Sequence, residues 1–415
     1  MEKQWAGTTY GNGWMHKWLI RMLRYIPIEV LYAFVAVFVI PVCLIINPAT
    51  GLTYRYFRER WQYSTLKSAL KTYRNFLLFG EVVVDRFAMY AGKHFDFHVE
   101  GYVHYQKLAE REEGFVQLSA HIGNYELAGY TLRAEKKRFN ALVFGGEKES
   151  VMQNRNRMFA DTHIRMIPIK EDMSHMYDIN NALADGEIVS MPGDRMIGSK
   201  KDIAIPLLGA VCHLPQGPFS IATMRRLDCL AVNVMKTSRK GYTIYATPLH
   251  YDKTTARETQ ERQLAQSYID ELERILTMYP EQWYNYFEYW DDIHLLLPQQ
   301  EPYVLIDRLM RFEKNKVVTK SSVSALNTVG GLLENIAQTS SARIGFINRY
   351  ILHRDVSAGM LAAVPEMKIY ALPKAGDTIT TTLEVTAEVF DMCMAKAEVR
   401  RGDELLATAE LKFKN

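Results

Sequence analysis

The chain has 415 residues, which is too long for one ordinary hydrophobic core, so we expect two or more domains. Its composition, with 48% hydrophobic and 23% charged residues, is that of a folded protein and excludes a repetitive or disordered chain. The net charge of only +3 gives no reason to expect a nucleic-acid partner. The four cysteines are scattered without metal-ligand or disulfide spacing, which predicts no metal site and a reduced, cytoplasm-facing setting.

The positive charge is concentrated near the N-terminus, around an apolar segment. Residues 1–75 hold ten Lys or Arg and three acidic residues, a balance of +7, so the remainder sums to −4. Residues 30–46 carry no charge, include Pro41, and are at the short limit for crossing a bilayer. A signal peptide would end at a small-residue cleavage site, which is absent. We predict that residues 1–90 form a membrane-associated helical region embedded in the cytoplasmic leaflet; a single span and a buried core helix are the alternatives.

Residues 91–295 alternate short apolar strands with helices. We expect a strand, a helix and a strand over 95–120, and a further strand at 141–146. A helix followed by a strand should end at Ile169, and another helix should end at Gly186 before a strand through Met191. A hairpin-like strand pair is expected over 228–249, a helix over 259–278, and an apolar loop before a helix over 205–222. This alternation predicts an α/β layer architecture.

The alternation of strands and helices ends near residues 295–301, LLLPQQE, which indicates a linker. Beyond it, residues 301–415 contain one central helix over 330–350, followed by several alternating strands. A helix followed by a long antiparallel meander predicts a second domain of the α+β class.

The stretch VQLSAHIGNYELAGY places His121 and Glu126 five residues apart at a predicted strand-to-helix junction. Within one helix these positions lie about 140° apart and cannot meet, but a turn at Gly123 can fold them together. Glu126 would then hold the imidazole in one tautomer while His121 takes a proton from a hydroxyl. Composition alone gives about one such spacing by chance, so the pair needs support from its surroundings.

That support comes from later blocks of the same domain. SMPGDRMIG places Asp194 and Arg195 directly after a strand, where loop residues of an α/β sheet meet ligands; a local surface ion pair is the alternative. The blocks PLLGAVCHLPQGP and PEQW follow in order.

Taken in this order, residues 10–295 resemble the bacterial lipid A biosynthesis acyltransferase family of the lysophospholipid acyltransferase superfamily. HIGNYE matches the HX4(D/E) motif of that family, and GDR, PLLG…LPQGP and PEQW match its later blocks. The resemblance implies that His121 deprotonates the acceptor and that Glu126 orients His121. The acyl group would pass directly from the thioester of acyl carrier protein or coenzyme A, without a cofactor. Arg165, Asp194 and Arg195 fall where the family binds the acceptor or carrier, and we add Asn124 to these substrate-binding candidates.

Residues 301–415 resemble the hotdog fold of 3-hydroxyacyl-carrier-protein dehydratases. The resemblance rests on PYVLIDRL, GLLENIAQTSSARIG and LPKAGDTITTTLEV. It implies that Glu334, with Gln338 one turn later, faces a thioester tunnel shared across a dimer; a polar contact at a helix or dimer interface is the alternative. The His that precedes the helix in that family has no counterpart, and dehydration needs both a base and an acid. The nearby His353 follows the helix.

The sequence therefore predicts an acyltransferase at the cytoplasmic face of a bacterial inner membrane. Its hotdog domain would bind the acyl thioester and could pair into a homodimer. The expected partners are acyl carrier protein, the membrane surface and a lipid or glycolipid acceptor; a lipid A precursor, an aminolipid and an aryl polyene all remain open. A bifunctional acyltransferase and dehydratase, and a non-catalytic scaffold that binds acyl carrier protein, are the alternatives.

Overall fold

The structure is a computed structural model of the chain. It describes residues 18, 20–127, 132, 134, 136–143, 164–170, 172–196, 199, 201–322, 326–357, 359–390 and 392–414, with only the backbone at 126. The chain divides into two compact units, Met1–Asp202 with Leu214–Glu288, and Ile203–His213 with Tyr289–Asn415. The predicted hotdog segment lies inside the second unit, which also takes in a short stretch from the predicted acyltransferase segment.

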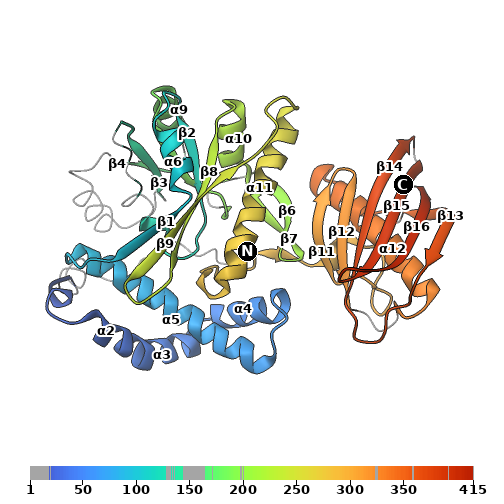
Figure 1. Ribbon diagram of the computed structural model, residues 1–415, viewed down its shortest axis with the longest axis horizontal. Coiled ribbons are helices and arrows are strands. Elements are labelled where there is room, and N and C mark those ends of the chain that lie inside the picture. The colour runs from blue at the N-terminus through green and yellow to red at the C-terminus, as the bar shows by residue number, and fades with distance from the viewer. Residues whose placement is uncertain are drawn as a thin grey trace. The chain divides into compact units, whose positions relative to one another are not determined.

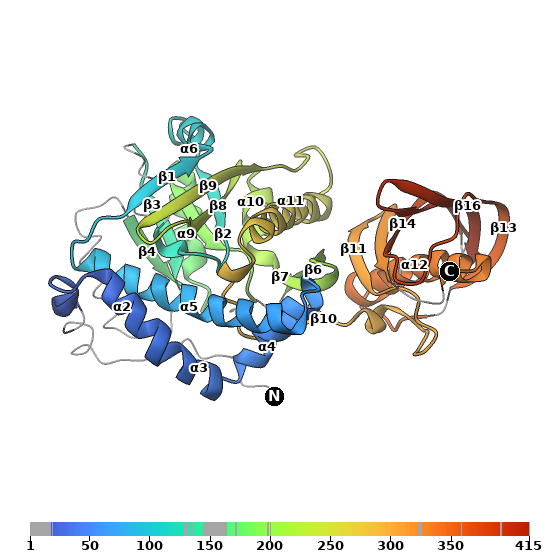
Figure 2. The ribbon, with the colours of Figure 1, turned by 60° about the horizontal axis from the view of Figure 1, so that its bottom comes forward.

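Helices dominate the first part of the first unit (Figure 2). They are α2 (Ile28–Phe34), α3 (Ile40–Ile46), α4 (Ala49–Arg55) and the long α5 (Thr65–Tyr90), with a π-helical turn, Val35–Val39, between α2 and α3 and another, Tyr56–Arg60, after α4. The first π turn stands just before Pro41, which lacks the N–H group that a regular α-helical hydrogen bond needs. The whole segment Ile28–Ile46 is, within the described part of the chain, the single helix long and apolar enough to cross a membrane.

One side of Ile28–Ile46 packs on α5. Ile28 and Tyr32 are buried with Leu23 against Val84 and Ala88. The opposite side exposes a set of large apolar side chains: Phe34, Val37, Phe38, Val42, Ile45 and Ile46. This segment therefore has one face for the protein and one apolar face that the described chain leaves uncovered.

A seven-stranded sheet forms the core of the first unit (Figure 1). Its order is β1-β9-β8-β2-β5-β3-β4, and the strands are β1 (Asp96–Glu100), β2 (Phe115–Ser119), β3 (Phe139–Val143), β4 (Ile164–Pro168), β5 (Ile188–Pro192), β8 (Cys229–Lys236) and β9 (Gly241–Leu249). Strands β8, β2, β5, β3 and β4 are parallel, while β9 is antiparallel to β8 and parallel to β1. The accompanying helices are α6 (Tyr102–Ala109), α9 (His175–Ala184), α10 (Gln216–Met224) and α11 (Arg257–Met278). The predicted α/β architecture and the β8–β9 hairpin are confirmed; the helix expected before β4 lies outside the described residues.

The apolar loop predicted over 205–215 is wrong, because this stretch forms a β-hairpin. Strands β6 (Asp202–Leu207) and β7 (Ala210–Pro215) are joined by Leu208 and Gly209, both with positive φ, and β10 (Trp290–Asp291) pairs with β7. Nearly every side chain of the hairpin is buried, so the sequence shows a continuous apolar run without the alternation that marks a half-buried strand.

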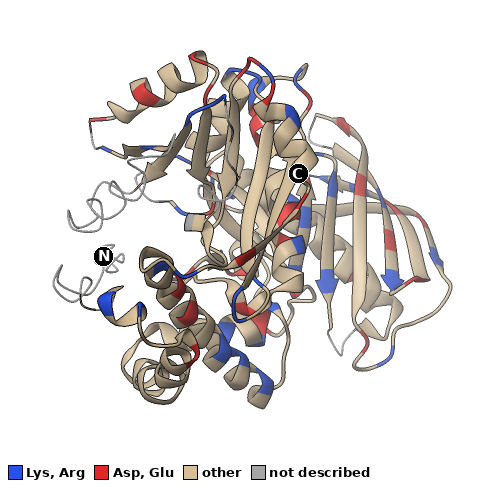
Figure 3. Cartoon of the chain, turned by 60° about the vertical axis from the view of Figure 1, so that its left-hand side comes forward, with Lys and Arg blue, Asp and Glu red and all other residues tan. Residues whose placement is uncertain are grey.

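The second unit contains a six-stranded antiparallel sheet of order β11-β12-β14-β15-β16-β13. The strands are β11 (Arg308–Glu313), β12 (Lys316–Ser321), β13 (Met360–Ile369), β14 (Ile379–Val389), β15 (Met392–Arg401) and β16 (Glu404–Lys414). Helix α12 (Val329–Phe346), extended by the π turn Ile347–Ile351, buries Leu332, Ile336 and Phe346 against this sheet. Lys, Arg, Asp and Glu residues all occur along its strands (Figure 3).

A helix packed against one curved antiparallel sheet is the arrangement of the predicted hotdog fold. The meander prediction is confirmed for β14, β15 and β16. It is wrong for the other strands: β11 and β12 precede the helix, and β13 pairs with β16. Local sequence patterns identify strands but cannot order them, since hydrogen-bond partners come from distant parts of the chain.

Candidate active site

Two loops at the carboxyl ends of neighbouring parallel strands form the candidate active site. Strands β2 and β5 pair in register from Phe115 with Ile188 to Ser119 with Pro192. The loops that follow these two strands therefore begin side by side. The backbone N–H of Gly193 donates to the Ser119 carbonyl at 2.9 Å and continues this pairing. Loop residues at this edge of a parallel sheet meet, and here the two loops bring His121 to Asp194.

His121 and Asp194 form a pair joined at two points. The Nδ1 atom of His121 lies 2.8 Å from Oδ1 of Asp194, and the backbone N–H of His121 donates to Oδ2 at 2.8 Å. The Asp194 side chain is fully buried, while that of His121 keeps 16% of its surface exposed. A carboxylate can only accept hydrogen bonds, so Nδ1 carries the proton and the lone pair of Nε2 is left for chemistry. Within the described residues, Nε2 has no hydrogen-bond partner.

The charge state of Asp194 follows from opposing effects. Burial by itself raises the pKa of this carboxyl group, because a charge is costly away from water. The His121 ring, its hydrogen bonds and the positive charge of Arg195 outweigh burial, so the pKa of Asp194 lies below its ordinary value. Asp194 is therefore ionised near neutral pH.

The loop that carries His121 is held on both sides. The Gly123 N–H donates to the Gln282 carbonyl at 2.8 Å, and the Asn124 N–H donates to the Val234 carbonyl at 2.7 Å. Gly123 has φ of 52°, and a Cβ atom there would lie 2.0 Å from the Val234 carbonyl oxygen. Only glycine fits this turn, and the turn fixes the orientation of the loop that carries the His121 ring.

Gln282, from the PEQW block, is a supporting residue that sequence reasoning missed. Its side-chain oxygen accepts from the Lys236 N–H at 2.9 Å, and its side-chain nitrogen donates to the Lys236 carbonyl at 2.8 Å. Gln282 thus ties the His121 loop to the end of β8. In the sequence, the sign of this role was a polar Gln282 among aromatic residues. Its partner Lys236 is 46 residues away, so the sequence does not reveal the contact.

Glu126 was predicted to hold the imidazole. Its backbone lies in the 3-10 turn Tyr125–Leu127, and its side chain lies outside the described part of the structure. The position at Nδ1 is occupied by Asp194, which sequence reasoning assigned to substrate binding. Asp194 stands 73 residues from His121, so only the adjacency of β2 and β5 reveals the pair.

Arg195 and Asn124 lie close to the pair. A terminal nitrogen of Arg195 donates to the Tyr284 carbonyl at 2.7 Å, and its guanidinium stands 5.7 Å from the Phe287 ring centre. Asn124 is fully buried and donates from Nδ2 to the Tyr242 hydroxyl at 3.3 Å. Both residues are bonded to other parts of the first unit, and the substrate-binding role assigned to them stays a prediction.

Arg165 is not brought to His121. It lies on β4, at the edge of the sheet, separated from β2 by β5 and β3. Its guanidinium pairs with Asp178 of α9 at 2.5 Å, and both side chains are partly exposed. This geometry is that of a surface ion pair, and the substrate-binding role assigned to Arg165 stays a prediction.

The predicted polar residues of α12, Gln338 and Glu334, contact the segment before β11 and each other. The Gln338 side chain accepts from the Leu305 N–H and donates to the Tyr303 carbonyl, each at 2.7 Å. It also donates to Oε1 of Glu334 at 2.8 Å. Gln338 is buried, whereas Glu334 is exposed. Gln338 therefore pins the segment before β11, and Glu334 is its surface neighbour.

The described residues offer neither a metal-binding group nor a reactive cysteine. No group of three or more His, Cys, Asp or Glu residues there could hold a metal ion. Burial raises the pKa of the Cys229 thiol far above its usual range, which makes it a poor nucleophile.

Comparisons with known proteins gave one family match and several solved structures of low similarity. The family model described as bacterial lipid A biosynthesis acyltransferase matches residues 81–290. No curated protein matches the chain. Among solved structures, the dehydratase heterocomplex ApeI:P from Xenorhabdus doucetiae is 18% identical over 30% of this chain and 91% of that chain, with a TM-score of 0.28. A hypothetical thioesterase with coenzyme A from Streptococcus pneumoniae is 15% identical over 26% and 83%, with a TM-score of 0.22.

Proposed function

Because the chain belongs to the bacterial lipid A biosynthesis acyltransferase family, we propose that it transfers a fatty acyl group from a thioester to a hydroxyl or amine of a lipid or glycolipid. The observation that carries this proposal is the His121–Asp194 pair, with its Nε2 atom unengaged in the described structure. A base of this kind suits direct transfer, which needs no nucleophilic side chain on the enzyme.

In the proposed reaction, Nε2 of His121 takes the proton of the acceptor as its oxygen or nitrogen attacks the thioester carbonyl. The tetrahedral intermediate collapses, the carbon–sulfur bond breaks, and the departing thiolate takes the proton back from His121. Asp194 favours the imidazolium that exists between these two steps. In this scheme Asp194 holds Nδ1 of His121, and the orienting role that the HX4(D/E) motif implies for Glu126 stays a prediction.

We propose that Ile28–Ile46 anchors the enzyme at the cytoplasmic face of the inner membrane. Its exposed apolar face and the basic residues on both flanks support this placement. A lipid acceptor stays in the bilayer, so an anchored enzyme meets its substrate at the surface.

The second unit is proposed to bind the acyl thioester, with acyl carrier protein as donor and a second copy of the chain as partner. We favour binding over dehydration, because Glu334 is exposed and its described neighbour is the amide of Gln338. An amide cannot carry the proton transfers that dehydration requires.

The test uses the full chain in detergent, an acyl carrier protein thioester and an extract of bacterial inner-membrane lipid. Thiol release and mass spectrometry of the lipids measure transfer. His121→Ala should lower the rate about a thousandfold, within the range that general-base catalysis contributes. His250→Ala, at an exposed position, is the matched control. Full activity of His121→Ala would exclude the assignment, and enoyl thioester formed from a 3-hydroxyacyl donor would restore the dehydratase alternative.

A further inference from the structure

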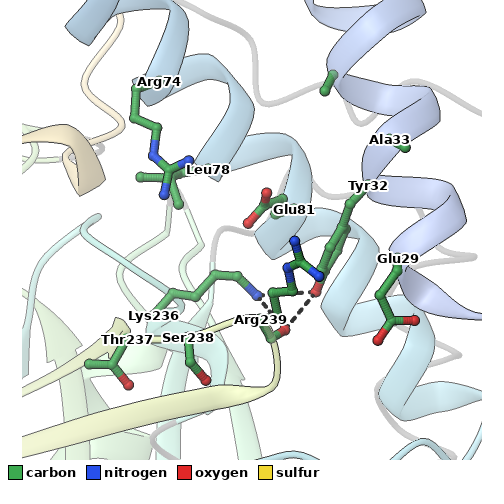
Figure 4. A pocket seen from close by; sticks show the side chains of 11 residues that line it. Glu29, Tyr32, Ala33, Arg74, Leu78, Glu81, Lys236, Thr237, Ser238 and Arg239 are labelled. Carbon is green, nitrogen blue, oxygen red and sulfur yellow. Dashed lines mark hydrogen bonds between the residues drawn. The ribbon is translucent and has the colours of Figure 1, made fainter.

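A cavity of about 390 Å³ lies between α2, α5 and the turn that joins β8 to β9 (Figure 4). Arg74 and Glu81 reach into it from α5, and Arg239 reaches into it from the turn. None of the candidate site residues His121, Asp194, Arg195 and Asn124 lines it, whereas Lys236, whose backbone Gln282 holds, does. The cavity therefore adjoins the end of β8 that supports the His121 loop but contains none of the candidate site residues.

The floor of the cavity is a fixed polar network. The ammonium group of Lys236 lies 2.6 Å from Oδ2 of Asp85 and 3.1 Å from both the Tyr32 hydroxyl and the Arg239 carbonyl. These three contacts use all its donors. The side chains of Asp85 and Lys236 are 0% and 3% exposed, and the Tyr32 and Tyr242 hydroxyls both donate to Asp85. Lys236 is thus neutralised within the protein and is not free to bind a ligand.

The rim carries charged side chains that make no hydrogen bond or ion pair with a described residue. Neither Arg74 nor Arg239 makes a side-chain hydrogen bond or ion pair there, and Glu81 makes none either. Burial raises the pKa of Glu81, although Lys236, Arg74 and Arg239 are near enough to act against this. Glu29, also on the rim, is already paired with Lys240 at 3.3 Å. Two guanidinium groups and one carboxyl group therefore line the same cavity without forming an ion pair with one another.

The remaining wall is apolar. Ala33 and Ala36 line the cavity from Ile28–Ile46, and Leu78 lines it from α5. On the same helical segment, Val37 and Phe38 are 63% and 62% exposed. A molecule with a polar head in the cavity could lay an apolar tail along this surface.

We propose that the cavity binds the headgroup of a bilayer phospholipid that bears both a phosphate and a primary ammonium group. Arg74 and Arg239 bind the phosphate, since guanidinium groups match phosphate oxygens in charge and geometry. Glu81 accepts hydrogen bonds from the ammonium. A headgroup with phosphate alone leaves Glu81 without a partner, and a quaternary ammonium has no N–H group to donate to it.

This site goes beyond the proposed acyl transfer, since its ligand is a lipid of the surrounding membrane and its lining residues do not include His121 or Asp194. It is tested by binding without any thioester, so its failure would leave the acyltransferase proposal untouched. Failure of the acyltransferase assay would likewise leave this site untouched.

The experiment is native mass spectrometry of the full chain in a non-ionic detergent, titrated with phosphatidylethanolamine, phosphatidylcholine or phosphatidylglycerol of matched acyl chains. We expect one phosphatidylethanolamine molecule to bind about tenfold more tightly than the other two lipids, as expected for one charge-assisted hydrogen bond. Glu81→Gln should abolish the preference over phosphatidylcholine. Arg239→Gln should weaken binding of all three lipids.

Arg225→Gln, an equal loss of charge on the exposed end of α10, is the control and should bind as the unaltered chain does. Equal affinity for all three lipids, or an unchanged preference in Glu81→Gln, would overturn the proposal. Stronger binding of phosphatidylglycerol would show an anion site instead. Soluble glycerophosphoethanolamine that binds as tightly as the lipid would exclude a membrane lipid as the ligand recognised.

Discussion

Each unit of this protein contains a histidine paired with an aspartate, and the two pairs differ in geometry. In the first unit, His121 uses Nδ1, and Asp194 is fully buried. In the second unit, His213 uses Nε2, which lies 3.2 Å from Asp291, and both side chains are about 30% exposed. The second oxygen of Asp194 accepts from the His121 backbone, whereas Oδ2 of Asp291 also accepts from the Tyr350 hydroxyl at 2.5 Å.

The difference is what suits the first pair, and not the second, to the proposed proton transfer. Asp194 binds one residue at two points, and this sets the tautomer and the position of the His121 ring. Asp291 joins His213 on β7 to Tyr350 after α12, so it links the β6–β7 hairpin to the helix within the second unit. The first pair leaves Nε2 of His121 without a hydrogen-bond partner among the described residues, and the second connects the β6–β7 hairpin to the segment after α12.

The strongest test of this difference compares the acyl-transfer rates of Asp194→Asn and Asp291→Asn. We expect Asp194→Asn to lower acyl transfer by about a hundredfold or more, because the amide favours the wrong imidazole tautomer. Asp291→Asn should leave the rate within about twofold of the unaltered chain, as for a residue outside the site. The measurement is the rate of thiol release at saturating donor. Similar losses in the two variants would contradict the distinction.

Gly123→Ala tests whether the position of the His121 ring matters as much as its partner. The added Cβ would stand 2.0 Å from the Val234 carbonyl oxygen, so the loop must move. We expect the transfer rate to fall about tenfold or more, because small displacements of a catalytic group are costly. Gly217→Ala in α10, where a Cβ meets nothing within 4 Å, is the control and should keep its rate. An active Gly123→Ala variant would show that the loop tolerates displacement.

The two aspartates should also differ in their effect on acid stability. The pKa of Asp194 is lowered in the folded protein, so its pairing contributes stability above the unfolded pKa, about 3.9, that is lost as the pH falls toward the folded pKa. Asp194→Asn should lower the stability at pH 7 and flatten its decline between about pH 5 and pH 2. The pKa of Asp291 is also lowered, chiefly by the hydrogen bond to His213, but its exposure makes the effect smaller. Urea unfolding across this range measures both; an equally steep decline in Asp194→Asn would contradict the account.

The smallest expected effect belongs to Tyr350→Phe. It removes the hydroxyl that donates to Asp291 and should cost the second unit about 1 kcal/mol, the usual value for one hydrogen bond. Acyl transfer should be unchanged. Thermal unfolding and thiol release measure the two properties, and a loss of activity without a loss of stability would give the second pair a functional role.

The sequence predicted the elements with strong local patterns. The apolar helix at Ile28–Ile46, the α/β alternation and the central helix of the second unit follow from periodicity and composition over short windows. The same holds for His121 as the candidate base, because its motif and the glycine of its turn lie within six residues. The β6–β7 hairpin was missed, since complete burial removes the alternation that identifies a strand.

The partners of these residues were decided only by the tertiary structure. Asp194 meets His121 across 73 residues because β2 and β5 are neighbours in the sheet, and Lys236 meets Asp85 across 151 residues because α5 packs beside β8. The sequence therefore determined which residue types could do chemistry and where strands and helices run. The order of strands in the sheet determined which carboxylate holds the candidate base, since hydrogen bonding between strands joins segments that are far apart in the sequence.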